Sequence, residues 1–387
     1  MMPIYLDNNA TTPLDPRVKD AMLPALESHF GNPASNTHAY GWYAAELVEI
    51  ARENVARCIG ANPKEIVFTS SATESINLAL KGFCFHNYRS TGIKSKLITI
   101  PTEHKATLDT GYAMDSWTTD LKLIPVDRNG FIDKDRLDDE LKEDKPCIFS
   151  ISLANNEIGT IQNVKELVSQ IKNKRPQTIA HVDASQAVGK MIVDVKELNV
   201  DLLSFSAHKI YGPKGSAALY INKDAALRLE PLLHGGSHEH GLRAGTLNVA
   251  GIVGFGKAAE LVSIELDTDI KRIKTLTQSF FTTLKSQCST LILNGPGIDG
   301  RLPGNLNLLT PGVRNVDLIS RLSSKIAFSI SSACTSHSKK PSHVLEAIGL
   351  TETEQRESFR IGVGKFTTQS ELDSAAKLFA EAISDLS

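Results

Sequence analysis

The sequence predicts an α/β protein whose large domain holds a mostly parallel sheet of seven strands, followed by a smaller α+β domain. Through residues 65–221, short β-branched runs alternate with longer helical patterns, which is typical of βαβ units. From about Val249 to Leu284 a long helical pattern changes this rhythm. At 387 residues the chain is long enough for two domains. We therefore assign residues 14–255 to the large domain, and residues 1–13 and 256–387 to the smaller one.

Seven short apolar runs, rich in Val, Ile, Leu and Phe, are the expected strands of the large domain. They cover residues 65–69, 96–100, 121–126, 147–151, 178–183, 202–206 and 217–221. The first expected helix, residues 74–83, follows the first of these strands. In the smaller domain we expect strands at 291–293 and 304–308, separated by a loop at 294–300.

Composition and charge exclude several classes of function. The hydrophobic fraction is 41% and the charged fraction 22%, both ordinary for a globular protein. A net charge of −2 gives no basic surface for direct contact with nucleic acid. No apolar run approaches the ~18 residues of a membrane span, and the N-terminal residues do not resemble a signal peptide. We therefore expect a cytoplasmic protein without membrane or direct nucleic-acid contacts.

The cysteines also indicate a reducing compartment. They are dispersed and never spaced as C-x-x-C, which disfavours a disulfide framework or a zinc site. The five are Cys58, Cys84, Cys147, Cys288 and Cys334. Three of them, Cys58, Cys84 and Cys147, lie in apolar helix or strand patterns, where we expect them to be buried.

Lys209 and Asp183 each follow or end an apolar run of strand length. Both would therefore lie at the carboxyl ends of neighbouring strands, where open α/β sheets bind ligands. A lysine withdrawn from water there can lose its proton and form a Schiff base with an aldehyde. Enzymes that use pyridoxal 5'-phosphate (PLP) need such a lysine and an aspartate for the pyridine nitrogen. A surface lysine beside a capping aspartate is the structural alternative for this pair taken alone.

Small hydroxyl residues at 69–75 lie between an expected strand and an expected helix. Backbone N–H groups at such a helix start can bind a phosphate, although a plain N-cap explains the same residues. The sequence has no Gly-x-Gly-x-x-Gly and no Gly-Lys-Ser/Thr loop, which disfavours nicotinamide, flavin and ATP sites. Ser206 and His208 flank the lysine and could add phosphate contacts. His104 follows a strand and could stack on a planar cofactor, although a lone histidine there is often structural.

Two further segments bear on chemistry. His238-Glu239-His240 places two imidazoles close together, but no third ligand stands at a convincing spacing, so we expect no metal site. Cys334 lies in a polar segment of small residues with Lys339 and Lys340 nearby. Exposure and positive charge favour the thiolate, so this cysteine is the candidate for a reactive thiol. An incidental loop cysteine is the alternative.

The motifs taken together resemble the NifS/IscS-type cysteine desulfurases, which are PLP enzymes of fold type I in the class V aminotransferase family. The similarity runs nearly end to end, with several long motifs in the same order. It covers residues 5–13, 30–35, 68–75, 103–105, 155–159, 181–186, 204–215, 243–246, 332–336 and 360–362.

This resemblance implies a role for each matching residue around PLP. Lys209 would form the Schiff base and later move protons at the substrate Cα, and Asp183 would keep the pyridine nitrogen protonated. His104 would stack on the ring and act as acid and base, and Gln186 would contact the phenolic oxygen. The other cofactor contacts, mainly to the phosphate, would come from Ala72, Thr73, Ser206, His208 and, across a homodimer, Thr246.

The resemblance also implies the reaction. Arg360 and Asn155 would hold the carboxylate of L-cysteine, with Asn8 as a further substrate contact. Cys334 would attack the substrate sulfur and become a persulfide, with release of alanine. The cysteine segment, about residues 328–341, would then deliver the sulfur to an acceptor protein. That acceptor could serve iron–sulfur cluster assembly, tRNA thiolation or sulfur modification of DNA.

The chain departs from the family pattern near this cysteine. Ser331 stands where a glycine is common, and Ile330 where a small polar residue is usual, so we expect altered sulfur delivery or partner choice. Three alternatives share the scaffold. A selenocysteine lyase would run the same elimination on selenium. An aminotransferase for small amino acids would need Lys209 and Asp183 but not Cys334. A scaffold protein would need none of these residues.

Overall fold

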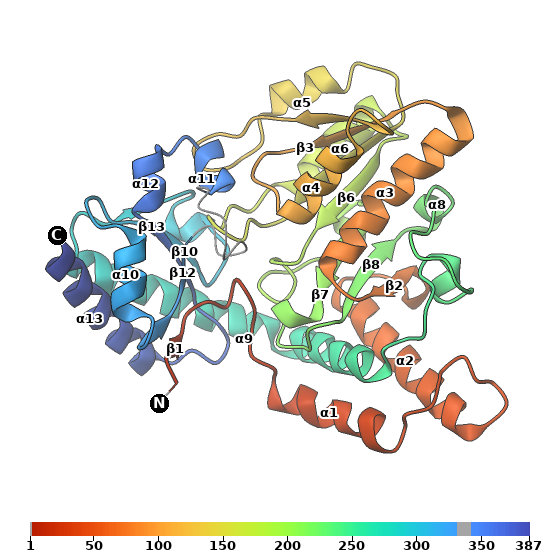
Figure 1. Ribbon diagram of the computed structural model, residues 1–387, viewed down its shortest axis with the longest axis horizontal. Coiled ribbons are helices and arrows are strands. Elements are labelled where there is room, and N and C mark those ends of the chain that lie inside the picture. The colour runs from red at the N-terminus through yellow and green to blue at the C-terminus, as the bar shows by residue number, and fades with distance from the viewer. Residues whose placement is uncertain (1, 331–341) are drawn as a thin grey trace.

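The structure, a computed structural model, describes residues 2–330 and 342–387 and has a larger and a smaller α/β part (Figure 1). A seven-stranded sheet forms the centre of the larger part, with the strand order β2-β8-β7-β6-β5-β3-β4. Strands β7, β6, β5, β3 and β4 are mutually parallel, whereas β8 lies antiparallel between β7 and β2. The predicted α/β class and the mostly parallel sheet of seven strands are therefore confirmed.

The seven strands lie close to the predicted runs. They are β2 (Ile66–Thr69), β3 (Ser95–Thr99), β4 (Thr119–Leu123), β5 (Cys147–Ser152), β6 (Ile179–Asp183), β7 (Leu202–Ser206) and β8 (Ala217–Ile221). Every strand except β4 is buried along its whole length, as continuous apolar runs in a covered parallel sheet should be. The edge strand β4 was predicted at residues 121–126, which is two to three residues too far along the chain. Its ladder ends at the pair Thr99 and Leu123, because Pro101, which follows β3, has no N–H to donate the next bond.

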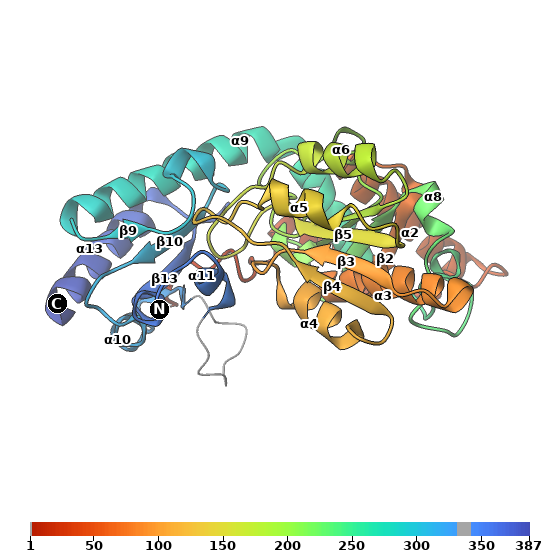
Figure 2. The same cartoon turned by 90° about the horizontal axis from the view of Figure 1, so that it is seen from above.

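Helices cover both faces of this sheet (Figure 2). Helices α3 and α4 pack on one face, and α2, α6 and the first half of α9 pack on the other. The helices of this part are α1 (Pro16–Glu27), α2 (Ala39–Cys58), α3 (Ala72–Thr91), α4 (Lys105–Met114), α5 (Lys134–Glu140), α6 (Val164–Lys174), α7 (Val195–Leu198), α8 (Lys223–Ala226) and α9 (Val249–Gln287).

Helix α3 is longer than the predicted 74–83, because its apolar face continues to be buried beyond Phe83. It begins at the N-cap Ser71 and ends at Gly92, which has a φ of 69°. That left-handed backbone favours glycine and stops the helix. The start of α3 therefore lies next to the end of β2, where the predicted site residues are.

The smaller part is built around an antiparallel sheet in the order β12-β13-β10-β9, beside a parallel pair of β1 and β11. The strands are β1 (Ile4–Tyr5), β9 (Ile292–Leu293), β10 (Asn305–Leu309), β11 (Ile326–Ala327), β12 (Ser329–Ile330) and β13 (Ser358–Gly362). The helices are α10 (Asn315–Leu322), α11 (His343–Ala347), α12 (Glu352–Arg356) and α13 (Gln369–Leu386).

Helix α9 joins the two parts, and Figure 1 shows it running beneath both. Its first half buries Phe255 in the core of the larger part, and its second half buries Phe280 in the core of the smaller part. The predicted boundary near residue 255 lies within this helix. Leu6 also belongs to the second core, so the first residues of the chain pack with its last third. No helix in the described ranges is long and apolar enough to cross a bilayer.

Candidate active site

A cavity of about 290 Å³ lies at the carboxyl ends of strands β5, β6 and β7. Open α/β sheets bind ligands at this edge, and the volume approaches that of small-molecule sites. The cavity brings together nine of the residues predicted from the sequence. They are Ala72, Thr73, His104, Asp183, Gln186, Ser206, His208, Lys209 and Arg360.

Lys209 lies in a short 3-10 turn directly after β7. Its Nζ donates hydrogen bonds to the backbone oxygens of Asn9, at 2.7 Å, and Ala10, at 2.8 Å. These contacts connect the end of β7 to the N-terminal segment of the chain. The amine is therefore held inside the cavity, where it could react with an aldehyde.

Asp183 ends β6 and is only 8% exposed. Its Oδ1 accepts a hydrogen bond from the backbone N–H of Ser185 at 2.9 Å. Parallel pairing places Asp183 beside Ser204 of β7, five residues before the lysine. A carboxylate in this position could pair with a protonated ring nitrogen of a planar cofactor.

His104 is the N-cap of α4, and its Nδ1 accepts a hydrogen bond from the backbone N–H of Ala106 at 3.1 Å. The neutral ring therefore carries its proton on Nε2. Desolvation lowers the pKa of His104; the Asp183 carboxylate opposes this shift, and the positive charge of Lys209 adds to it. His104 is consequently neutral near pH 7 and can both accept and donate a proton.

The start of α3 forms one wall of the cavity through Ser71, Ala72 and Thr73. Ser71 caps the helix by accepting from the backbone N–H of Glu74, so the N-cap interpretation of this segment is confirmed. The first N–H groups of a 20-residue helix still lack intrahelical partners and favour an anion. Opposite them, the Ser206 Oγ is buried without a hydrogen-bond partner among the described residues.

His208 lies beside Ser206 at the same end of the cavity, and its Nδ1 is 3.1 Å from Thr11 Oγ1. Burial, with the nearby charges of Lys209 and Lys214, lowers the pKa of His208 to about 4. The ring is therefore neutral at pH 7. It can contact an anion only as a hydrogen-bond donor, not as a charge.

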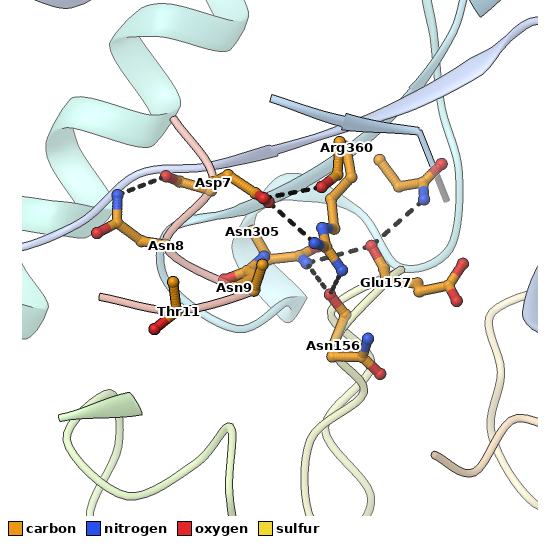
Figure 3. Close-up of polar contacts among 12 residues, drawn as sticks. Asp7, Asn8, Asn9, Thr11, Asn156, Glu157, Asn305 and Arg360 are labelled. Carbon is orange, nitrogen blue, oxygen red and sulfur yellow. Dashed lines mark hydrogen bonds and ion pairs between the residues drawn. The ribbon is translucent and has the colours of Figure 1, made fainter. Parts of the chain in front are cut away.

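Arg360 reaches the cavity from β13, so the smaller part contributes a cation to the site (Figure 3). Its Nη2 lies 2.9 Å from Asp7 Oδ1, and its Nη1 donates to the backbone oxygen of Asn156 at 3.3 Å. Its Nε is buried and has no partner among the described residues. The guanidinium thus keeps an unused donor in a cavity that could admit a carboxylate.

The structure does not bring Asn155 and Asn8 to this cavity. The Asn155 amide donates to the Thr102 oxygen and accepts from two backbone N–H groups. The Asn8 amide donates to the Gly362 oxygen at 2.9 Å. Their neighbours Asn156 and Asn9 line the cavity instead. The substrate-binding roles of Asn8 and Asn155 therefore remain predictions.

Two other predicted residues remain, Thr246 and Cys334. Thr246 is exposed and lies elsewhere on the chain. Cys334, the expected reactive thiol, lies outside the described residues, as does Ser331.

The remaining cysteines have the properties of structural thiols. Burial raises the pKa of Cys58 to about 12, of Cys84 to about 11 and of Cys147 to about 12, and it also raises the pKa of Cys288. Cys84 and Cys147 are buried, as predicted, whereas Cys58 is only partly buried, at the end of α2, where it packs against the core. These four thiols stay protonated at neutral pH and are poor nucleophiles.

Sequence analysis also did not identify Glu103, which binds Ser152 of the cavity wall. Its carboxyl group accepts hydrogen bonds from the backbone N–H of Ser152, at 2.7 Å, and from the Ser152 hydroxyl, at 2.5 Å. Burial raises the pKa of Glu103 to about 8, and the Asp183 charge adds to this. The only sequence signal was its place beside His104 in a motif.

The candidate metal segment His238-Glu239-His240 has a different structural role. Arg52 donates to both carboxylate oxygens of Glu239, and the backbone N–H of Phe68 donates to one of them. The described part of the chain contains no group of three or more His, Cys, Asp or Glu side chains placed to hold a metal ion.

Comparisons with known proteins agree with this geometry. The Aminotransferase class-V family matches residues 4–374. "Cysteine desulfurase IscS" of Anaeromyxobacter sp. (strain K) is 44% identical over 385 residues, which cover 100% of this chain and 93% of the relative. Among solved structures, a "NIFS-like protein" has a TM-score of 0.91 and 37% identity, and all of each chain is covered.

A second solved structure, titled "SspA in complex with cysteine", has a TM-score of 0.80 and 34% identity over 94% of this chain and 100% of that one. The matches span both parts of the fold and every segment that lines the cavity. The chain therefore belongs to the class-V aminotransferase family and, within it, to the NifS/IscS-type cysteine desulfurases.

Proposed function

We propose that this protein is a PLP-dependent cysteine desulfurase that converts L-cysteine to L-alanine and takes the sulfur as a persulfide on Cys334. One observation carries the proposal. Lys209, His104, Arg360 and the pair Asp183 and Gln186 come from four segments of the chain and line one cavity. A lysine, an aspartate and a carboxylate-binding arginine are the groups that PLP chemistry on an amino acid requires.

The residues present fit the cofactor. The Ser206 and Ser185 hydroxyls are buried without a partner among the described residues, and both line the cavity. Buried polar groups are normally hydrogen-bonded, so these two suit oxygens of a bound ligand. Ala72, Thr73 and His208 complete an anion site at the start of α3, and Thr246 would contact the phosphate bound by a second subunit. Bound PLP would serve as an electron sink at the substrate Cα.

The protein side chains would bind the substrate and transfer protons. Arg360 would bind the substrate carboxylate through its unused Nε–H and hold the Cα in place. Lys209, freed from its backbone contacts, would move the proton at Cα. His104, neutral near pH 7, would act as a proton donor and acceptor in the cavity. Asn9 and Asn156 also line the cavity and add polar groups to its wall.

Transfer of the substrate sulfur to Cys334 requires no external oxidant. The Cys334 thiolate attacks the substrate sulfur, an S–S bond forms and the substrate C–S bond breaks. The electron pair of the broken bond goes to the carbon, which takes protons and leaves as alanine. The four described cysteines all have raised pKa values, which leaves Cys334 as the candidate nucleophile.

We also propose a homodimer in the cytoplasm that passes sulfur to an acceptor protein for iron–sulfur cluster assembly, tRNA thiolation or sulfur modification of DNA. Exposed apolar side chains on and before α2, among them Phe30, Tyr40 and Trp42, support a subunit interface. The free thiols of the described cysteines support a reducing compartment. Sedimentation of the PLP-loaded protein tests the dimer, and a monomer at micromolar concentration would contradict it.

The test of the activity compares wild type with Cys334→Ala, both PLP-loaded, in L-cysteine with a reductant. Wild type should release sulfide and alanine in equal amounts. Cys334→Ala should stay yellow but lose at least about a hundredfold in rate, because the nucleophile is absent. Cys58→Ala is the matched control and should keep its activity. If Cys334→Ala released sulfide and alanine as fast as wild type, the persulfide role of Cys334 would be wrong.

A further inference from the structure

Lys190 is a buried lysine next to the cavity, in the turn that follows Gln186. It is 7% exposed, and no carboxylate of the described residues forms an ion pair with it. Its Nζ instead donates to the side-chain oxygens of Gln186, at 2.9 Å, and Asn9, at 3.2 Å. Both of these amides line the cavity, whereas Lys190 lies behind them.

This contact determines which way the two amides point. The Lys190 amine donates to the side-chain oxygen of each amide, so both oxygens face Lys190. The nitrogens of both amides are then turned away from it. Gln186 Nε2 donates to the backbone oxygen of Asn9 at 2.9 Å. Asn9 Nδ2 is buried without a partner among the described residues, although its side chain belongs to the cavity wall.

We propose that Lys190 is a positioning residue that holds Asn9 and Gln186 with their N–H groups toward the cavity, where they donate to anionic oxygens of the bound cofactor and substrate. The inference rests on the proposed function, since the family resemblance implies that Gln186 would donate to the phenolic oxygen of PLP. With Lys190 removed, each amide can rotate and present its oxygen, which would repel an anionic acceptor.

The charge balance of the site supports this role. Burial, together with the charges of Lys209 and Arg360, lowers the pKa of Lys190 to about 7. An unpaired buried cation among other cations is costly to the folded protein. An anionic ligand in the cavity would offset that cost, so the arrangement suits a protein that binds an anion here. A lysine kept only for stability would have a carboxylate partner, as Lys96 has in Glu140 and Glu143.

The test uses Lys190→Met in the full-length protein, with two readouts on the PLP-loaded form and one on the apoprotein. A hydrogen bond donated by Gln186 would make the phenolic oxygen a weaker base toward the proton that it would share with the Lys209 nitrogen. The pH midpoint of the visible absorbance should therefore rise by about one unit in Lys190→Met. The affinity for PLP should fall about tenfold. The melting temperature of the apoprotein should be unchanged or higher, because an unpaired buried charge is gone.

Two further variants sharpen the result. Lys96→Met also removes a buried lysine, but at the opposite end of the sheet, and should leave the absorbance midpoint unchanged. Lys190→Arg keeps a cationic donor and should give a midpoint between wild type and Lys190→Met. A wild-type midpoint in Lys190→Met, or an equal shift in Lys96→Met, would overturn the positioning role alone. A wild-type protein that does not become yellow with PLP would overturn the proposed function and this inference with it.

Discussion

Asp7 and Arg360 form a largely buried ion pair at the cavity, with Asp7 Oδ1 2.9 Å from Arg360 Nη2 (Figure 3). The second oxygen of Asp7 accepts a hydrogen bond from the Ser329 hydroxyl at 2.8 Å. Asp7 therefore aligns the guanidinium that would bind the substrate carboxylate, and it also competes with that carboxylate for the positive charge. These two effects can be separated by substitution.

Asp7→Asn keeps an acceptor for Arg360 but removes the competing charge. We expect the KM for L-cysteine to fall several-fold with kcat little changed, while the free energy of unfolding falls by about 1–3 kcal/mol. Asp7→Ala loses the alignment as well and should raise KM. Steady-state kinetics and urea unfolding measure both quantities. A higher KM in Asp7→Asn would show that the full charge of Asp7 is needed for substrate binding.

Lys209→Ala removes the amine that the structure holds between two backbone oxygens of the N-terminal segment. The variant should bind PLP without covalent attachment, so reduction with borohydride should leave no cofactor fixed to the chain. Activity should fall by at least about a thousandfold, because both attachment and proton transfer at Cα are lost. Lys214→Ala, on the same turn region but outside the cavity lining, is the control. Covalent PLP in Lys209→Ala would assign the attachment to another lysine.

The stability of the apoprotein should depend on pH through Glu103. Its carboxyl group has a pKa raised to about 8 by burial, compared with 4.5 for the ordinary value. A raised folded-state pKa means that the folded protein holds the extra proton. Its stabilising effect is fully present below about pH 4.5 and is lost as the pH rises through 8. The free energy of unfolding should therefore fall between pH 6 and pH 8.5.

Glu103→Gln isolates this effect, because glutamine is nearly the same size and does not titrate. Between pH 6 and 8.5 the variant should lose less stability than wild type, by at least about 1 kcal/mol. Thermal unfolding of both apoproteins across that range is the measurement. Parallel curves for the two proteins would mean that Glu103 remains ionised in the folded state.

The sequence was most informative where burial on both faces produces continuous apolar runs. Strands β5, β6 and β7 were located within one or two residues, and their carboxyl ends placed Asp183 and Lys209 together. The edge strand β4 was predicted two to three residues too far along the chain, since partial exposure of the strand leaves a weaker apolar pattern in its sequence. The end of α3 was missed, because its last turn, residues 88–91, is exposed and mostly polar and so carries no apolar pattern.

Individual side chains of the site were harder to predict, because successive residues of an irregular segment point in different directions. Asn9 rather than Asn8 meets the cavity only because the N-terminal segment crosses the end of β7 and bonds with Lys209. Lys190 gave no signal at all, since a lysine after Gly189 resembles a surface residue. Its burial follows from the same long-range crossing, through its contact with Asn9.

The buried pair of Arg52 and Glu239 should stabilise the segment that carries Thr246. Arg52 Nη2 lies 2.8 Å from Glu239 Oε1, both residues are almost inaccessible to water, and Glu239 Oε2 also accepts from the backbone N–H of Phe68 at 2.7 Å. These bonds tie α2, β2 and the start of residues 239–246 together. Glu239→Gln leaves the guanidinium buried without its counter-charge and should cost about 3–5 kcal/mol of unfolding free energy.

The double variant Arg52→Met with Glu239→Gln removes both charges, so it should be more stable than the sum of the two single variants predicts. Arg314→Met is a control, because its ion pair with Asp317 is exposed and should contribute about 1 kcal/mol or less. Urea unfolding of the apoproteins gives all four free energies. Strict additivity of Arg52→Met and Glu239→Gln would show that the two charges do not stabilise each other. The position of residues 239–246 would then depend on the backbone contacts of the segment alone.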